Sequence, residues 1–334
     1  MNNETKLAGS WFIWGLSYYL YYPFVSLFVI KFISDVTLVY LISTLFAIPM
    51  PLIGAKLTRK IGLIKTIELG SILSGLGLIL FSFSENLVWL IITYTLSSAF
   101  FITLPSYYSY MNNLGKGVIA KLWAISIIPS LFIPSVGGLI ASFFGLRTIF
   151  LLGGILMILT FLPIAKLEEI EIDNEKIKID IRILFPILVI LPIALTFPYI
   201  YLILREKYFL SYGEIGFLAT IAEIIGAVFT FIYSRFTKRF LLSLYLVLFS
   251  LVYLTYYSFV FSIFFGLWES LIPTALEESK GKTPEAFGII NSLQQAMWEV
   301  GYLVSYFTFS PRFSILISSL LAIILSIIFL LFKK

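Results

Sequence analysis

The chain has 334 residues, of which 60% are hydrophobic and only 12% are charged, and its mean hydropathy is +1.02. A soluble domain carries about 25% charged residues, so this composition excludes a soluble globular protein and indicates a membrane protein. The net charge of +5 comes from basic residues spread over short loops, so we expect no nucleic-acid partner. The chain contains neither Cys nor His, and we expect no metal, no cofactor and no imidazole proton relay.

Apolar runs of membrane-spanning length follow one another along nearly the whole chain. A helix needs about 20 apolar residues to cross a bilayer, and only helices or closed barrels satisfy the backbone there. No run alternates as barrel strands do, so we expect an all-α membrane protein. The runs are Trp11–Ile30, Val36–Ala55, Thr66–Phe83, Leu87–Asn112, Leu122–Phe144, Thr148–Ala165, Ile183–Leu204, Tyr212–Ser234, Phe240–Glu277, Phe287–Phe307 and Phe313–Phe332.

The run Phe240–Glu277 is nearly twice as long as one crossing. Basic residues precede and follow it, and placing all of them in the cytoplasm requires two crossings that turn near Tyr256 and Ser258. The chain then has twelve transmembrane helices and cytoplasmic N- and C-termini, and we expect it in the plasma membrane. All but five of the 23 Lys and Arg residues are then cytoplasmic, a strong positive-inside bias; the five outside are Lys31, Arg147, Arg205, Lys207 and Arg312.

One charged segment divides the chain into two halves. Lys166–Arg182 is the longest polar stretch, and we interpret it as a cytoplasmic linker between six helices in residues 1–165 and six in residues 183–334. Short basic loops recur after the second and eighth helices, at Gly54–Lys65 and Ser234–Arg239. Parallel repeats with a site between them are typical of one large class of secondary transporters.

The loop Gly54–Lys65 resembles the motif that the major facilitator superfamily carries between its second and third helices. That motif is a Gly, then an Asp-Arg pair, then a Gly followed by basic residues. Here Thr58 stands where the Asp should be, Arg59 keeps its place and Gly62 is one residue late. The chain resembles this family along essentially its whole length, which implies the fold of two pseudo-symmetric six-helix bundles.

The resemblance implies a gate at this loop. In the family the Asp helps to lock the outward-facing state against the start of helix eleven. That start here reads Thr283-Pro284-Glu285, with Thr as N-cap, Pro at the first helical position and an acid that complements the helix dipole. Thr58 cannot supply the charge of the missing Asp, whereas the Arg contacts can remain. The residues expected in the gating loops are Gly54, Thr58, Arg59, Gly62 and Arg235.

The fifth helix carries a second family-like motif. Pro134-Ser-Val-Gly137-Gly138 resembles the Gly-Pro-x-x-Gly-Gly core of the family's antiporter motif, with Ile133 in place of the first Gly. The motif favours export. The alternative is a plain kink with close packing, because small residues let membrane helices approach one another. The region from Pro273 to Gly301 is also similar to the family's helix ten to eleven region.

Three acidic residues lie at membrane depth, where each costs ~2.5–3.5 kcal/mol on insertion scales and usually marks an ion or substrate path. Glu223 is near the centre of the eighth helix, Glu269 is in the tenth and Glu299 is near the middle of the eleventh, with no Lys or Arg at similar depth. One explanation is hydrogen bonding between helices, worth ~0.6–2 kcal/mol per contact. Burial disfavours the charged form of a carboxyl group, so we favour proton or cation coupling for Glu269 and Glu299 and leave both explanations open for Glu223.

Polar and aromatic residues suggest the wall of a substrate cavity. Aromatic rings beside carboxylates suit a lipophilic cation, although aromatic residues form 18% of this chain and many will face lipid. The resemblance implies a cavity lined by helices one, four, seven and ten, and the eleventh helix has one broad polar face. The candidates are Trp14, Tyr18, Tyr22, Tyr94, Tyr199, Trp268, Asn291, Gln295 and Trp298.

These observations predict a secondary active transporter that exports a lipophilic or cationic small molecule in exchange for protons. The alternative is uptake or exchange of a neutral solute such as a sugar, and a more remote one is a membrane receptor or scaffold that does not transport. An enzyme is not expected, because the sequence has no phosphate-binding Gly-Lys-Ser/Thr loop, no paired Asp-rich motifs and no His ligands. The expected partners are a small-molecule substrate, protons and the lipid bilayer, and the chain is expected to be a monomer.

Overall fold

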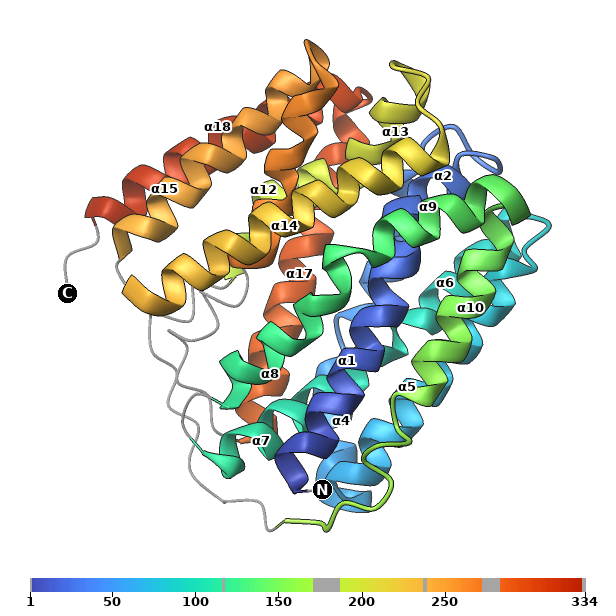
Figure 1. Ribbon diagram of the computed structural model, residues 1–334, viewed down its shortest axis with the longest axis vertical. Helices are drawn as coiled ribbons and strands as arrows, with labels where there is room; N and C mark the ends of the chain where they lie inside the picture. The colour runs from blue at the N-terminus through green and yellow to red at the C-terminus, as the bar shows by residue number, and fades with distance from the viewer. Residues whose placement is uncertain (1, 116–117, 171–186, 237–238, 272–282, 332–334) are drawn as a thin grey trace.

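The computed structural model describes residues 2–115, 118–170, 187–236, 239–271 and 283–331, and these are almost entirely helical (Figure 1). Within them, seven helical stretches are long and apolar enough to cross a membrane. Three shorter apolar stretches accompany them, Leu146–Leu159, Phe240–Tyr256 and Phe259–Leu271. The predicted all-helical, multi-pass membrane protein is therefore confirmed, whereas the count of twelve crossings stays a prediction.

In the first half of the chain, most apolar runs fold into a helix that is interrupted by a short turn. Pro105 and Pro134 stand in the first turn of the helix that follows such an interruption, and Pro23 stands in the 3-10 turn η1 itself, positions where a missing N–H costs nothing. The elements are α1 (Asn3–Tyr21), η1 (Tyr22–Phe24), α2 (Val25–Val29), α3 (Thr37–Ala47), α4 (Met50–Ile61), α5 (Leu63–Ser82), α6 (Leu87–Ser97), η2 (Ser98–Ile102), α7 (Leu104–Leu114), α8 (Val118–Ile127), η3 (Ile128–Leu131), α9 (Ile133–Phe144) and α10 (Leu146–Leu159).

The second half repeats this pattern of broken and continuous helices. The long run that begins at Phe240 is interrupted at residues 257–258, and the 3-10 helices on either side of the interruption pack against each other. Most of the proposed linker, residues 171–182, lies outside the described residues. The elements are α12 (Ile190–Thr196), α13 (Ile200–Glu206), α14 (Tyr212–Phe236), α15 (Arg239–Ser250), η5 (Leu251–Tyr256), η6 (Phe259–Leu267) with a helical turn at residues 268–271, α17 (Pro284–Thr308) and α18 (Pro311–Leu331).

Small residues hold neighbouring helices together. The Ser17 hydroxyl on α1 donates to the Gly153 carbonyl on α10 at 2.7 Å, and the Ser318 hydroxyl on α18 donates to the Pro192 carbonyl on α12 at 2.6 Å. A Cβ added to Gly75 on α5 would lie 2.6 Å from the carbonyl oxygen of Gly154 on α10, so these two backbones touch. Membrane helices associate through such close packing and hydrogen bonds, since lipid provides no hydrophobic force between them.

The two halves of the chain meet along two seams. On one, α9 packs against α14, where the hydroxyls of Ser135 and Thr220 are 2.8 Å apart and a Cβ on Gly138 would lie 3.1 Å from the Cα of Gly216 (Figure 1). On the other, α17 packs against α3 and α4, and a Cβ on Gly288 would lie 3.1 Å from that of Ala55. The predicted motif of the fifth helix therefore lies at a contact between the halves.

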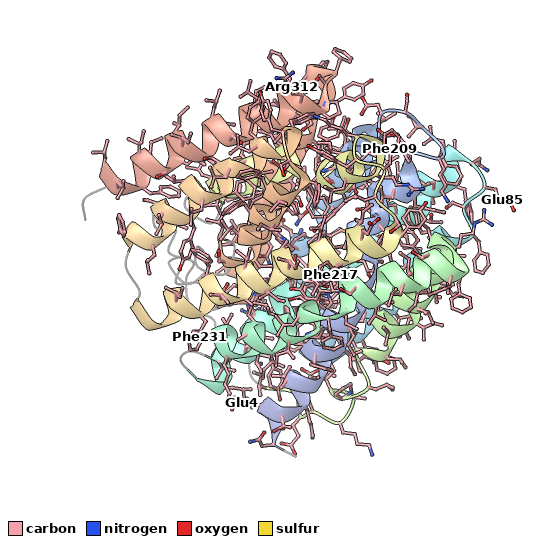
Figure 2. All side chains as sticks on the ribbon, turned by 45° about the horizontal axis from the view of Figure 1, so that its top comes forward. Glu4, Glu85, Phe209, Phe217, Phe231 and Arg312 are labelled. Carbon is pink, nitrogen blue, oxygen red and sulfur yellow. The ribbon has the colours of Figure 1, made fainter. Side chains whose placement is uncertain are left out.

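The outer surface is strongly apolar, as expected of a surface that meets lipid. Phe217 and Phe231 project from α14 with 59% and 58% of their surface exposed (Figure 2). On α17 the exposed side chains are Leu293, Val300, Leu303 and Phe307, whereas its polar residues Gln294 and Gln295 are buried. Each long helix thus separates a lipid-facing side from a side that faces the interior.

Candidate functional site

A cavity of about 220 Å³ opens in the interior, and both halves of the chain contribute to its wall. The wall is mostly aromatic, with polar groups at a few positions, the usual composition of a small-molecule site. It includes one acidic residue and no Lys or Arg among the described residues. The predicted site residues on this wall are Trp14, Tyr18, Tyr22, Tyr94, Trp268, Glu269, Gln295 and Trp298, and further rings come from Tyr40, Phe197 and Tyr302.

Four predicted residues do not line this cavity. Tyr199 is buried just before α13, and its hydroxyl donates to the Ser305 carbonyl at 3.5 Å. Asn291 is buried within α17, and its amide nitrogen has no hydrogen-bond partner among the described residues. Glu223 and Glu299 lie outside the wall as well, and their surroundings are described below.

A column of stacked rings on the first helix forms one side of the cavity. Trp14 and Tyr18 stack at 5.1 Å between ring centres, and Tyr18 and Tyr22 stack at 5.0 Å, both nearly parallel. These residues recur at steps of four, which brings side chains of a helix above one another. Trp268 faces this column, with its ring centre 5.9 Å from that of Tyr22. The arrangement presents aromatic faces and edges from both halves to whatever occupies the cavity.

Glu269 is the acidic residue of the wall. It lies on the helical turn after η6, and only 2% of its surface is exposed. The Tyr19 hydroxyl on α1 donates to its Oε1 at 2.8 Å. Among the described residues, no Lys or Arg forms an ion pair with it. A carboxyl group in this setting can accept hydrogen bonds, exchange a proton or balance a positive charge in the cavity.

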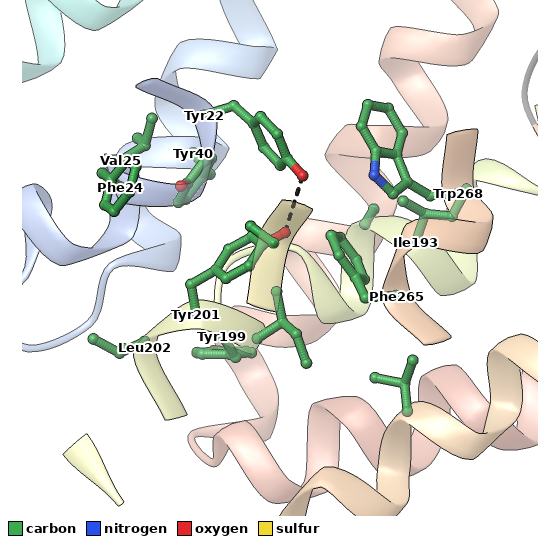
Figure 3. Close-up of a cluster of buried hydrophobic side chains, with 14 of the residues drawn as sticks. Tyr22, Phe24, Val25, Tyr40, Ile193, Tyr199, Tyr201, Leu202, Phe265 and Trp268 are labelled. Atoms are coloured by element: carbon green, nitrogen blue, oxygen red, sulfur yellow. Dashed lines mark hydrogen bonds between the residues drawn. The ribbon is translucent and has the colours of Figure 1, made fainter. Parts of the chain in front are cut away.

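Glu223 lies one layer behind the wall and is fully buried on α14. Its Oε1 accepts hydrogen bonds from the hydroxyl of Tyr22 and from Nε1 of Trp268, the latter at 3.2 Å. The Tyr22 hydroxyl is also 2.9 Å from that of Tyr201 on α13, and Figure 3 shows this pair with Trp268 beside it. The other oxygen of Glu223, Oε2, has no hydrogen-bond partner among the described residues. Two side chains of the cavity wall, Tyr22 and Trp268, therefore bind Glu223 on the side that faces the cavity.

Glu299 lies apart from the other two acids. It is half-buried on α17, and one of its oxygens is buried without a hydrogen-bond partner in the described part of the chain. The next residue along, Val300, and Leu303 one turn further are 44% and 42% exposed on the lipid-facing side of this helix. The structure thus separates Glu299 from Glu269, although both were predicted as coupling residues.

Sequence reasoning missed Tyr19 and Tyr201. The cavity candidates predicted on the first helix are Trp14, Tyr18 and Tyr22, and Tyr19 is rotated by about 100° from its neighbour Tyr18. The available signal was the acidic residues themselves, because a buried carboxyl group needs hydrogen-bond donors and a tyrosine hydroxyl can supply one.

Comparison with known proteins identifies the fold. No family model and no curated protein matches the chain. Among solved structures, it is similar to the POT family transporter PepTSo, with 12% identity and a TM-score of 0.73 over 98% of this chain and 97% of that one. It is also similar to an auto inhibited POT family peptide transporter (11% identity, 0.73, covering 98% and 96%) and to the human organic anion transporter MFSD10 (12%, 0.72, covering 98% and 100%).

The chain has the major facilitator fold. The resemblance predicted from the loop motifs is thereby confirmed at the level of structure. All three of these structures are of transporters. Identities of 11–12% show the fold alone, so substrate and mechanism have to be argued from the residues of this chain.

In this major facilitator fold, the last turn of α4 keeps a charged contact with α17. Arg59 Nε lies 2.6 Å from Glu285 Oε1, and Thr283 caps α17 by accepting from the Ala286 N–H at 3.3 Å. Thr58, at the expected Asp position, instead pairs with the Ser106 hydroxyl at 2.6 Å. The side chain of Arg235, the corresponding residue of the second loop, lies outside the described part of the chain.

The turn between α4 and α5 is held by a different acid. Gly62 has a φ of +96°, a conformation that favours glycine, and a Cβ added there would lie only 2.5 Å from a carboxylate oxygen. That carboxylate belongs to Glu169 and accepts from the N–H groups of Leu63 and Ile64 at 2.9 and 3.0 Å. An acid at a helix N-terminus satisfies free N–H groups and complements the dipole. Glu169 therefore stabilises the loop from which the Asp is missing.

Proposed function

We propose that this chain is a secondary active transporter that exports a small lipophilic monocation in exchange for protons. The observation that carries the proposal is Glu269, a buried acid on the wall of an aromatic cavity without a Lys or Arg partner among the described residues. An ionised carboxylate in such a place needs a cation, and a neutral one needs a proton. A site that binds either a cation or a proton, but not both at once, can exchange the cation for the proton.

The wall of the cavity supports the charge and size of this substrate. The aromatic column of Trp14, Tyr18 and Tyr22 faces Trp268, and such rings attract cations through their faces. With one acid on the described wall, the site balances a single positive charge. Its volume of about 220 Å³ is below the ~300–1,000 Å³ of drug-sized sites, which favours a compact molecule.

The substrates named for two similar structures suit this cavity less well. Those proteins transport peptides and organic anions. A carboxylate in a cavity needs positive charge or several donors, and the described wall contains no Lys or Arg. We therefore place the substrate of this chain in a different class.

The proposed architecture follows from the apolar runs of the sequence and from the basic residues between them. Residues 1–165 and 183–334 form two six-helix bundles, joined by a cytoplasmic linker at 166–182, with both termini in the cytoplasm. The chain works as a monomer in the plasma membrane. The motif Pro134, Gly137 and Gly138 on α9 supports export, because it resembles that of antiporters in the family; Pro134 and Gly138 contact α14, and Gly137 packs against Leu20 of α1.

A second candidate is the transport of a neutral solute such as a sugar. Its support is the presence of amides and hydroxyls on the same wall, including Thr44, Ser97 and Gln295. These groups can bind the hydroxyls of a solute without any charge. In this case Glu269 would serve as a hydrogen-bond acceptor.

Flux into proteoliposomes tests these alternatives. The purified chain is reconstituted, a pH gradient is imposed, and uptake of the small aromatic cation methylphenylpyridinium is compared with that of glucose. We expect gradient-driven accumulation of the cation, saturable and absent from protein-free vesicles. Accumulation of glucose alone would establish the second candidate. Cation binding without flux under any gradient would instead identify a receptor.

A further inference from the structure

Two hydrogen bonds to buried acids join the two halves of the chain. Glu223 on α14 and Glu269 after η6 both belong to the second half, whereas their partners Tyr22 and Tyr19 belong to the first helix of the first half. The paired residues lie 201 and 250 positions apart in sequence. The strength of this contact between the halves therefore depends on two groups that can gain or lose a proton.

The surroundings of the two acids contain no permanent charge in the described part of the chain. The titratable groups that face them are tyrosines, Tyr18, Tyr19 and Tyr22 from the first segment and Tyr201 from α13, together with the two acids themselves. Like charges that share one buried site cannot both persist, so at most one of the two carboxyl groups is ionised at a time. They titrate as a pair rather than as two independent sites.

The protonation of this pair changes the bonds from the tyrosines. A hydroxyl donates more strongly to a carboxylate than to a neutral carboxyl group, and the difference is largest where water is excluded. Trp268 Nε1 and the Tyr22 hydroxyl both converge on one oxygen of Glu223, which leaves the second oxygen without a donor. Gaining a proton therefore weakens the contact between the halves, and losing it strengthens that contact.

We propose that Glu223 and Glu269 form one proton-binding pair, and that Tyr19 and Tyr22 are positioning residues that transmit its protonation to the contact between the two halves. The inference rests on the proposed proton coupling and names the residues through which the proton acts on the packing of the helices. Glu269 lies on the cavity wall, whereas Glu223 lies behind the wall, where its charge does not contact the substrate. Tyr201, which bonds Tyr22 but neither acid, has no such role.

The absence of Cys from the chain allows a direct test of this movement. Spin labels are attached through Glu85→Cys in the first half and Glu206→Cys in the second, both at exposed positions. The two positions lie toward the same end of the molecule, since Arg147 binds the Ser84 carbonyl and both Arg147 and Arg205 lie near Lys31. Pulsed electron paramagnetic resonance then gives the distance distribution at mildly acidic and mildly alkaline pH, without substrate.

We expect the distribution of the parent chain to change with pH. In the Tyr19→Phe/Tyr22→Phe variant this response should be lost, with the distribution fixed at its acidic form, because the weakened contact is then permanent. The matched control is Tyr201→Phe, which also loses one hydroxyl between the halves and should keep the response. The Glu223→Gln/Glu269→Gln variant should behave like Tyr19→Phe/Tyr22→Phe. It replaces the Phe variant in the experiment if the Phe variant does not fold.

Two results would overturn the inference. One is a pH response that survives in both double variants, and the other is a parent chain whose distances do not respond to pH. The outcome is separable from that of the transport assay. A pH response lost in the Phe variant would stand even if the cation is not transported. Proton-driven cation flux with an intact response in that variant would leave the proposed function standing and remove the role of the tyrosines.

Discussion

Glu269 carries the proposed coupling, so its substitution gives the sharpest prediction at the level of single residues. Glu269→Gln keeps the size of the side chain and its capacity to accept from Tyr19 but cannot titrate. Gradient-driven accumulation of the cation should fall at least ~10-fold, since a coupling group is lost rather than a single hydrogen bond. The remaining flux should no longer depend on pH. Proteoliposome flux over a range of pH measures both effects.

The control for this substitution is Glu206→Gln. Glu206 lies at the exposed end of α13, away from the cavity, and its loss should leave flux and pH dependence unchanged. Wild-type accumulation and unchanged pH dependence in Glu269→Gln would remove Glu269 from the mechanism and support hydrogen bonding between helices as its role.

For Glu299 we expect the opposite result. Its carboxyl group lies off the cavity wall and has one buried oxygen without a partner in the described structure, which destabilises the fold. Glu299→Gln removes the possibility of an unpaired charge, so the midpoint of thermal unfolding should stay the same or rise. Flux should remain within about twofold of that of the parent chain, because this carboxyl group does not line the cavity. A loss of coupling equal to that in Glu269→Gln would place Glu299 on the proton path after all.

The sequence allowed the acids to be found, but it could not show which of them lies on the cavity wall. A carboxyl group inside an apolar run stands out whatever the rotation of the helix, so Glu223, Glu269 and Glu299 were all predicted. Their separation into a wall residue, a residue behind the wall and a half-buried residue near lipid depends on helix rotation and packing. The bonds from Tyr19 and Tyr22 could not be predicted either, because they join residues more than 200 positions apart.

At the level of the helices, the packing of α14 against η6 is set by two glycines. A Cβ on Gly266 would overlap the backbone of Ala222, and one on Gly226 would lie 3.0 Å from the Cβ of Glu269. Gly266→Ala should therefore force the helices apart and lower the free energy of unfolding by ~1–3 kcal/mol, the usual cost of overpacking. The matched control is Gly213→Ala on α14, where the nearest atom would be 3.7 Å away. Equal thermal midpoints for the two variants would contradict this packing.

The contact between α4 and α17 gives a second prediction at this level. The Arg59–Glu285 pair is about one-third exposed, so we expect a coupling energy of ~0.2–1 kcal/mol. The midpoints of thermal unfolding of Arg59→Gln, Glu285→Gln and the double variant form a cycle that isolates this energy. The coupling should shrink in high salt, because the pair is partly exposed. A coupling of zero in low salt would show that the pair does not stabilise this seam.

Helix positions followed from hydropathy, whereas the interruptions within the helices did not. The run Tyr212–Ser234 corresponds to α14, Tyr212–Phe236, and Thr66–Phe83 corresponds to α5, Leu63–Ser82. The 3-10 turns η1, η2 and η3 lie inside runs that read as continuous, because their residues are as apolar as those around them. Hydropathy records which solvent a segment prefers and does not record its backbone geometry.

At the scale of the whole molecule, the predicted topology can be tested by chemical labelling. Single cysteines introduced at Asn174 and Lys282, both outside the described residues, should react with a membrane-impermeant thiol reagent from the cytoplasmic side only. A cysteine at Glu85 should react only from the opposite side, because it lies in the loop between α5 and α6. Labelling of Asn174→Cys and Lys282→Cys from opposite sides would show that the chain does not cross twice between Phe240 and Glu277.

The placement of the indole rings has a practical consequence for spectroscopy. The chain has six Trp residues, and five of them, Trp11, Trp14, Trp123, Trp268 and Trp298, line the cavity. The sixth, Trp89, is 41% exposed on α6. Intrinsic fluorescence therefore arises mainly from the rings that a bound molecule would touch, so an occupant should alter emission intensity in unlabelled protein. A quencher dissolved in the lipid should reduce the emission of Trp89 alone, so the emission that remains reports the cavity. Binding of a molecule can therefore be followed without a label.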